Sequence, residues 1–202
     1  MHAFLHELRI QRWDDHRFYH HSRINQTLHF ISALSFLIAY VVVFFDPPKA
    51  ALIAWLVAMV TRQSGHFFFE PRGYDQVNQV THEHKEEIKV GYNLRRKVVL
   101  HAVWAGVPLA LWLRPDLFGL IEPAQGFAGW LDQLGWAWFA VGVGALVLRT
   151  AHLCIIRSPL TGFAWFAKIL TDPFNDALLY RGAPAALLRG ELIDPQHARH
   201  PR

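Results

Sequence analysis

Histidine is the residue type in this chain best suited to metal chemistry. The 202 residues include 13 histidines but one cysteine, Cys154. Imidazole is the commonest metal ligand in proteins and suits iron, copper and zinc. A lone cysteine excludes an internal disulfide framework and any zinc or iron–sulfur site built from several cysteines of one chain. The composition therefore favours a metal site made of histidine, with or without carboxylates.

Two short stretches place histidine at helical spacing from other polar side chains. Asn25 and His29 are four residues apart, and so are His66 and Glu70. Residues four apart share one face of an α-helix, so Glu70 is expected either to bind the metal or to orient His66. Arg62 lies four residues before His66 on the same face. Histidine with carboxylate and no cysteine is the ligand chemistry of non-haem iron.

Four apolar runs must position these residues. They cover residues 28–45, 50–69, 98–113 and 134–156. A helix needs about 20 apolar residues to cross the hydrocarbon core of a membrane. A soluble bundle of very apolar helices is the alternative, but runs without a polar face are not typical of amphipathic surface helices. We therefore expect an all-α polytopic membrane protein with about four transmembrane helices.

The expected organisation has three parts. Residues 1–27 form a cytosolic N-terminal segment, and residues 28–156 form the four-span membrane domain with a cytosolic loop at 70–97. Residues 157–202 form a cytosolic or interfacial tail. Within that tail, residues 159–170 are expected to form an amphipathic helix that lies on the membrane.

The placement of basic residues predicts the orientation. Lysine and arginine number four before the first run, six between the second and third runs and six after the fourth, against one in each opposite connection. The positive-inside rule then puts both termini and the middle loop in the cytosol. The formal net charge of +4 follows from this topology. Because no recognisable nucleic-acid-binding motif is present, no nucleic-acid partner is expected.

Every histidine falls on the predicted cytosolic side. Ionisable groups inside membrane helices are costly and usually mark function; the alternative is that these imidazoles are solvated at the level of the lipid headgroups. His82 and His84 lie in the middle loop and are further candidate ligands, although their stretch also fits a solvated charged helix. Each of the four runs carries one histidine at a similar depth, namely His29, His66, His101 and His152.

The spacing of these residues resembles one known family. The chain reads His-x4-Asn-x3-His at 20–29 and Gly-His-x3-Glu at 65–70, with Trp55 before the second motif. This pattern resembles the membrane 2-hydroxy fatty acid dioxygenases of fatty-acid α-oxidation in phytosphingosine breakdown, and their bacterial relatives. The resemblance covers residues 13–115, and the tail from Pro159 has no counterpart in it.

The resemblance implies a multi-span membrane fold, Fe²⁺ and O₂ as co-substrate. It also implies that a 2-hydroxy acyl chain is shortened by one carbon. His20, His29 and His66 would hold the Fe²⁺. Positions would remain open for O₂ and for the substrate's carboxylate and hydroxyl, and chelation by both groups would place the bond that is cleaved.

The neighbouring polar residues would then support the site. Asn25 would position a ligand or the substrate, and Glu70 would orient His66 or complete the ligand shell. Arg62 would pair with the fatty carboxylate, or else extend towards the headgroups. The expected protein is an Fe(II)-dependent dioxygenase in a bacterial inner membrane or the endoplasmic reticulum, with its metal site at the cytosolic face. Its partners would be the lipid bilayer and a fatty acyl substrate.

Two other functions fit the same features. A membrane di-iron fatty-acid hydroxylase or desaturase would need a larger set of histidine ligands, although the paired His-x2-His-His boxes of that family are absent. A non-enzymatic membrane scaffold, or a metal or haem carrier, would use its histidines as surface residues or haem ligands. The di-iron alternative would have to recruit His16, His21, His82, His84, His101 and His152.

Overall fold

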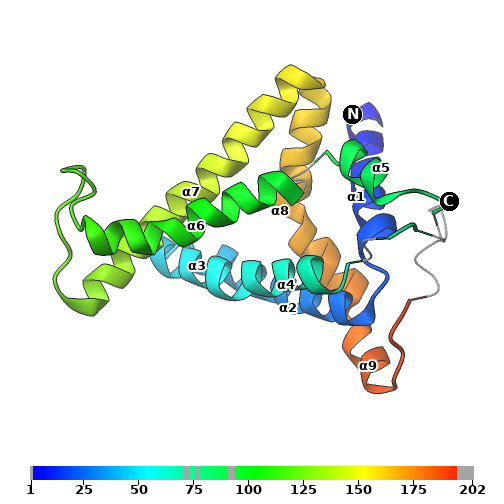
Figure 1. Cartoon of the computed structure of the whole chain (residues 1–202), viewed down its shortest axis with the longest axis horizontal. Coiled ribbons are helices and arrows are strands. Elements are labelled where there is room, and N and C mark those ends of the chain that lie inside the picture. Colours follow the sequence, from blue (N-terminus) through cyan, green and yellow to red (C-terminus); the bar gives the residue numbers. More distant parts are fainter. Residues whose placement is uncertain (1, 71–72, 76–77, 91–93, 195–202) are drawn as a thin grey trace.

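The computed structural model in Figure 1 describes residues 2–70, 73–75, 78–90 and 94–194. In these residues the regular structure is helical, and the β-type pairing is limited to two isolated bridges. The predicted all-α class is therefore confirmed. The end of the predicted tail, residues 195–202, lies outside the described residues.

Two helices lead through the N-terminal segment into the first apolar run. Helix α1 spans His2–Tyr19 and helix α2 spans Arg23–Val42. Ser22 caps α2, and its hydroxyl accepts a hydrogen bond from the backbone N–H of Asn25 at 3.4 Å. Serine is favoured at this position because it satisfies a backbone donor that the helix itself leaves unpaired. The short turn between the two helices carries His20.

The second apolar run forms one continuous helical segment. It consists of α3 over Pro47–Ile53, the π-helical η1 over Ala54–Met59 and α4 over Val60–Phe68. Asp46 caps its start by accepting a hydrogen bond from the backbone N–H of Lys49 at 3.0 Å, and a proline in the first turn suits a helix start. The segment returns along α2 and packs against it, so the end of α4 lies beside the start of α2.

The remaining helices complete the fold. In Figure 1, α7 and α8 form a long hairpin, and α8 returns towards the start of α2. Helix α8 packs against α1, α2 and α7, whereas α6 packs against α7. The ends of α1, α4 and α8 thus converge on the start of α2. These helices are α5 (His82–Ile88), α6 (Leu94–Leu113), α7 (Gly126–Ile156), α8 (Pro159–Tyr180) and α9 (Ala183–Leu188).

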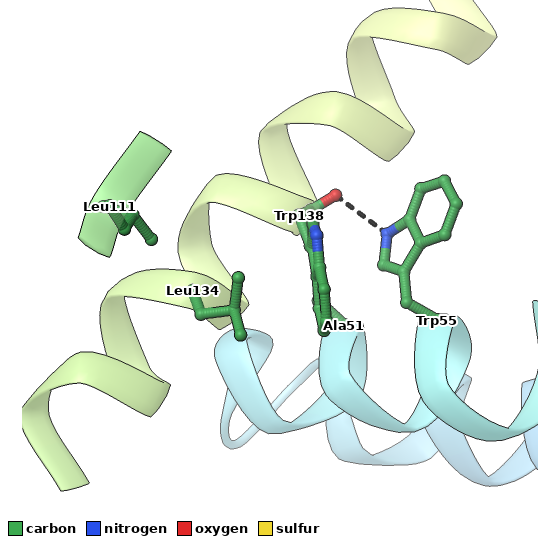
Figure 2. Close-up of a cluster of buried hydrophobic side chains, with 5 residues drawn as sticks. All are labelled: Ala51, Trp55, Leu111, Leu134 and Trp138. Carbon is green, nitrogen blue, oxygen red and sulfur yellow. Dashed lines mark hydrogen bonds between the residues drawn. The ribbon is translucent and has the colours of Figure 1, made fainter. Parts of the chain in front are cut away.

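Three tryptophans join η1, α6 and α7. The indole N–H of Trp55 donates to the carbonyl of Trp138 at 3.0 Å (Figure 2), and the indole N–H of Trp138 donates to the carbonyl of Trp104 at 3.0 Å. The ring of Trp104 stacks on both others, with centroids 5.9 Å from Trp55 and 5.6 Å from Trp138. A buried indole needs a partner for its N–H, so these hydrogen bonds fix how the apolar helices pack. Leu111 and Leu134 extend the same cluster.

Two of the helices are long and apolar enough to cross a membrane. They are α2, with a mean hydropathy of 1.4, and α7, with 1.9. The other two predicted spans correspond to the continuous segment from α3 to α4 and to a shorter apolar stretch of α6 at Lys97–Leu113. All four apolar runs are therefore helical, while four spans and cytosolic termini stay predictions.

The connections differ from the predicted organisation in two places. Helix α7 begins at Gly126, so the second half of the connection expected before residue 134 is helical. The helix expected at 159–170 continues to Tyr180 and packs against α1 and α2. One face of α8 is thus buried against the rest of the fold, with apolar and charged side chains among the buried ones, while the place of the tail relative to a membrane stays a prediction.

A close approach of α7 to α3 requires glycine at position 135. A Cβ atom there would lie 2.6 Å from both the Cβ and the carbonyl oxygen of Pro48. We expect Gly135→Ala to lower the stability of the purified protein by about 1–3 kcal/mol, since overpacking displaces backbone. Thermal unfolding in detergent would measure this loss.

The matched control is Gly144→Ala in the same helix, where a Cβ meets no atom within 4 Å. This change should leave stability equal or slightly raised, because alanine is the better helix former. Equal stability of the Gly135→Ala and Gly144→Ala variants would contradict the proposed packing of α3 and α7.

Candidate metal centre

Three histidines meet where the ends of α1 and α4 converge on the start of α2 (Figure 1). His20 lies in the turn after α1, His29 in the second turn of α2 and His66 near the end of α4. One ligand nitrogen from each lies within 4.8 Å of those from the others. His20 and His29 are 2% and 0% exposed, so the cluster sits in the interior. This is the group of three that the resemblance of the sequence motifs implied.

The spacing of the imidazoles fits a shared metal ion. The Nε2 atoms of His20 and His29 are 3.2 Å apart, and two nitrogens bound to one metal at about 2.0–2.1 Å each would lie about 3 Å apart. The ring of His66 has its centroid 5.3 Å from that of His20 and 4.8 Å from that of His29. Three imidazoles without cysteine form a donor set that suits iron, zinc or copper.

Glu70 orients His66. The Nδ1 atom of His66 donates to Oε2 of Glu70 at 2.8 Å, and both side chains are about nine-tenths buried. A carboxylate in this position fixes the tautomer and leaves Nε2 of the imidazole as the nitrogen for a metal. Of the two roles predicted for Glu70, the contact in the structure corresponds to orienting His66.

Asp176 faces His29 at ion-pair distance, without the hydrogen bond that joins Glu70 to His66. Its Oδ2 atom lies 3.6 Å from Nδ1 of His29 and accepts a hydrogen bond from Nη1 of Arg62 at 2.9 Å. Asp176 is 1% exposed. Burial raises the pKa of its carboxyl, but the charge of Arg62 and the contact with His29 outweigh burial and hold that pKa below its usual range. The carboxylate is therefore ionised and favours an Nδ1–H tautomer of His29.

The guanidinium of Arg62 binds the carboxylate of Asp176 in this structure, and its pairing with a fatty carboxylate stays a prediction. A buried arginine needs such a partner because an uncompensated buried charge is strongly destabilising. Arg62 thus acts on the metal centre through Asp176 and His29.

Asn25 and Gly65 pack against each other beside the cluster. Asn25 is 0% exposed, and a Cβ on Gly65 would lie 2.1 Å from its Oδ1 atom and 3.5 Å from Cδ2 of His29. Glycine therefore lets α4 approach α2 closely enough for His66 to reach His29. In this structure Asn25 sets the distance between the two helices that carry these ligands.

The turn that carries His20 is held by the segment that follows α9. The side-chain amide of Gln26 donates to the backbone carbonyl of His20 at 2.8 Å and to Oδ2 of Asp194 at 3.0 Å. The backbone N–H of Asp194 donates to the carbonyl of His21 at 2.8 Å, and Nη1 of Arg23 pairs with its carboxylate at 2.9 Å. These contacts fix the position of His20 in its turn. They join segments that are far apart in the sequence, so spacing alone does not predict them.

Burial keeps His20 in its neutral form. Burial is the largest cause that lowers the pKa of His20 well below its usual value, and repulsion from His29 and His16, were they protonated, adds to the effect. A neutral imidazole has a lone pair available for a metal. The Nδ1 atom of His20 is buried and has no hydrogen-bond partner within the part of the chain that the structure describes.

His16 and Tyr180 lie next to the three histidines. The Nδ1 atom of His16 and the hydroxyl of Tyr180 are hydrogen bonded. The ring of His16 has its centroid 5.3 Å from that of His20, and the ring of Tyr180 lies 5.7 Å from that of His20. His16 is thus adjacent to the cluster but engaged with α8.

The other candidate ligands lie away from the cluster. His84 is exposed at the start of α5, and His82 precedes it in the first turn. Nδ1 of His101 lies at hydrogen-bond distance from the carbonyl of Lys97, while exposed His152 pairs with Arg149 at 2.8 Å. Among the described residues, the metal-binding group contains none of the candidates His82, His84, His101 and His152. These four predicted ligands are therefore not brought together with the three histidines.

The sequence interpretation missed Asp176. The helix expected in the tail ended at residue 170, before Asp176, and the tail from Pro159 had no counterpart in the resemblance. Asp172 and Asp176 stand four apart in an otherwise apolar stretch. Carboxylates are rarely buried unless they are paired. Two of them in this stretch therefore indicate acids with cationic or histidine partners elsewhere in the fold.

Comparisons of the chain with protein-family models, with curated proteins and with solved structures find no match. The assignment of the site accordingly depends on its geometry.

The contact of Asp176 with His29 gives a testable consequence. We expect Asp176→Asn to weaken metal binding by about 10- to 100-fold, the usual effect of removing a carboxylate that orients a ligand histidine. Titration of the metal-free protein with Fe²⁺ under anaerobic conditions would measure it. The control is Asp172→Asn, which removes a buried carboxylate one turn earlier that pairs with Lys168. Equal affinities in the two variants would contradict the role of Asp176.

The close approach of α4 to α2 at Gly65 gives a second testable consequence. Gly65→Ala should push α4 from α2 and lower the affinity for Fe²⁺ while the helical content in circular dichroism is retained. Gly106→Ala, where a Cβ meets no atom within 4 Å, should bind Fe²⁺ like the wild type. Adding Asn25→Ala to the Gly65→Ala variant removes the overlapping side chain and should restore part of the affinity. Unchanged affinity in Gly65→Ala alone would show that this packing does not set the site.

Proposed function

We propose that this chain is a membrane-bound non-haem iron oxygenase that acts on a fatty acyl substrate. The observation that carries the proposal is the buried set of three imidazoles, whose ligand nitrogens lie within 4.8 Å of one another. Three protein ligands leave coordination positions of an iron ion open, as oxygenase chemistry requires. A structural metal site, in contrast, is usually closed by four protein ligands.

The membrane location is supported by the apolar helices. Helices α2 and α7 have the length and hydropathy of spans, and their outer faces expose side chains such as Val41 and Leu148. Large exposed apolar surfaces are typical of proteins that contact a membrane or a partner. We assign four spans to α2, the segment from α3 to α4, α6 and α7. The distribution of lysine and arginine then favours cytosolic termini and a metal centre at the cytosolic face.

The reaction that we favour is the oxidative shortening of a 2-hydroxy fatty acid. It is supported by the resemblance of the histidine motifs at 20–29 and 65–70 to the membrane 2-hydroxy fatty acid dioxygenases. One 2-hydroxy acid and one O₂ yield the acid shortened by one carbon, CO₂ and water, which balances without an external reductant. A bound ferrous ion would supply activation of O₂ and chelation of the substrate through its carboxylate and hydroxyl.

The residues of the chain prepare the site for this reaction. Glu70 and Asp176 hold the imidazoles of His66 and His29 with Nδ1 directed towards a carboxylate. Arg62 keeps Asp176 ionised, and the positive charge of its guanidinium offsets the negative charge of that carboxylate beside the metal. The burial of the cluster excludes bulk water, which limits unproductive oxidation.

The two alternatives make different demands. A di-iron hydroxylase or desaturase needs more histidine ligands than the described part of the chain brings together, and its reaction consumes electrons from an external reductant. A scaffold needs no iron at these histidines, and a metal or haem carrier could bind iron through them but needs no consumption of O₂.

Metal analysis together with an O₂ electrode tests the proposal. The detergent-purified protein should hold about one iron per chain and should consume O₂ with a 2-hydroxy fatty acid when no reductant is added. His29→Ala and His66→Ala should lose the iron and the activity, whereas the control His152→Ala should keep both. Iron held equally by all four proteins would place the metal elsewhere. About two irons per chain, or a requirement for a reductant, would favour the di-iron alternative.

A further inference from the structure

Helix α8, which lies between α7 and α1 (Figure 1), has an inverted distribution of charged and apolar side chains. Its three charged residues, Lys168, Asp172 and Asp176, are 4%, 4% and 1% exposed. The exposed positions of α8 carry apolar side chains and Thr171. A helix on the surface of a soluble protein has the opposite arrangement, with its charged face in water. The outer surface of α8 therefore presents no charged group to solvent.

The exposed apolar side chains form a stripe along α8. They follow one another at three-, four- and seven-residue spacing, which places them on one side of the helix. The largest exposed fractions in the stripe are 58% at Phe163, 54% at Phe174 and 69% at Leu178. Apolar surface of this kind marks contact with a membrane or with a partner. We call this face the outer stripe, and it consists of Leu160, Phe163, Leu170, Phe174 and Leu178.

The charges on the opposite side of α8 are compensated inside the fold. Lys168 pairs with Asp15 of α1 and, at 2.8 Å, with Asp172. Arg12 of α1 also pairs with Asp172, at 3.3 Å. Ionisable residues of membrane helices face the protein interior in this way and pair with one another. These ion pairs allow α8 to lie against lipid without turning a charge outwards.

The outer stripe adjoins α2, which is long and apolar enough to be a span. The ring of Phe174 has its centroid 6.1 Å from that of Tyr40 in α2, and the hydroxyl of Tyr40 donates to the backbone carbonyl of Leu170 at 3.1 Å. Near Tyr40 in the sequence, Ile38 and Val41 are 55% and 62% exposed. The exposed apolar surfaces of α2 and α8 thus meet at this contact, and lipid around α2 would also reach the outer stripe.

Arginines flank the outer stripe at both ends. Arg157 precedes α8 and Arg181 follows it, and both are exposed. The 22 residues between them span about 33 Å. Basic side chains at the ends of an apolar helix face extend to the lipid headgroups, where anionic lipids attract them. An apolar stripe between two cations therefore matches the chemistry of a bilayer.

We propose that the outer stripe of α8 lies in the lipid bilayer, with acyl chains against its apolar side chains and lipid phosphates at Arg157 and Arg181. This inference rests on the membrane location in the proposed function, and it is independent of the iron and of the reaction. It adds a fifth lipid-contacting helix to the four assigned spans. Because α8 also carries Asp176 to His29, the bilayer then supports the packing of the metal centre.

Spin labels on single cysteines test the proposal in nanodiscs of phosphatidylcholine and phosphatidylglycerol. Cys154 is the only cysteine of the chain, so Cys154→Ser gives a background for Phe163→Cys, Phe174→Cys and Leu178→Cys. Electron paramagnetic resonance then measures the collision rate of each label with O₂, which concentrates in lipid, and with a nickel chelate, which stays in water. We expect a high ratio of O₂ to nickel collisions at the three positions.

Two further positions calibrate the ratio. Leu148→Cys lies on α7, a candidate span, at a residue that is 72% exposed, and it should give the value for lipid. Glu83→Cys lies at an exposed position of the charged helix α5, and it should give the value for water. The labels on the outer stripe should resemble Leu148→Cys and exceed Glu83→Cys several-fold.

The outcomes separate this inference from the proposed function. Ratios on the outer stripe equal to that of Glu83→Cys, with a high ratio at Leu148→Cys, would overturn the inference and leave the membrane protein standing. Ratios as low as that of Glu83→Cys at all positions would overturn the membrane location as well. Dipolar broadening at Phe174→Cys with both collision rates suppressed would show a second copy of the chain on the stripe and would also overturn the inference. The labels are read on metal-free protein, so iron binding does not affect the result.

Discussion

The ion pair between Asp176 and Arg62 is the contact on which the geometry of the three histidines depends. It joins α8 to α4, and its carboxylate also faces His29 on α2. Both partners are largely buried, and neither charge could stay in the interior without the other. Because one carboxylate serves an arginine and an imidazole together, it fixes the tautomer of a ligand and the relative position of three helices. The metal centre is therefore part of the packing of the fold.

Close packing of α2 and α4 completes this arrangement. Gly65 gives the space that Asn25 fills, and Glu70 holds His66 from the following turn. Farther along the same helical segment, Trp55 of η1 is joined to Trp138 of α7, which in turn is hydrogen bonded to Trp104 of α6. A rigid scaffold of apolar helices thus supports a polar cluster at one end, which is how a membrane protein can keep a precise metal site.

The sequence predicted the helical class because apolar runs are local patterns, whereas the choice of His20, His29 and His66 came from the resemblance of two short motifs to a known family. Apolar runs indicate helices by themselves, and four-residue spacing puts His66 and Glu70 on one face. Asp176 and Asp194 could not be found in this way, since they reach the site through pairings of distant segments that spacing does not encode. For the same reason His101 and His152 looked equivalent to His29 in the sequence, although tertiary packing directs them elsewhere.

The central claim is that His20, His29 and His66 bind a single metal ion within one chain. X-ray absorption at the iron edge of the full-length protein, loaded anaerobically with ferrous iron, tests it most directly. The account predicts the scattering pattern of three imidazoles around one iron, with oxygen ligands in the remaining positions and no iron–iron distance. A spectrum with an iron–iron distance, or one without imidazole scattering, would contradict it.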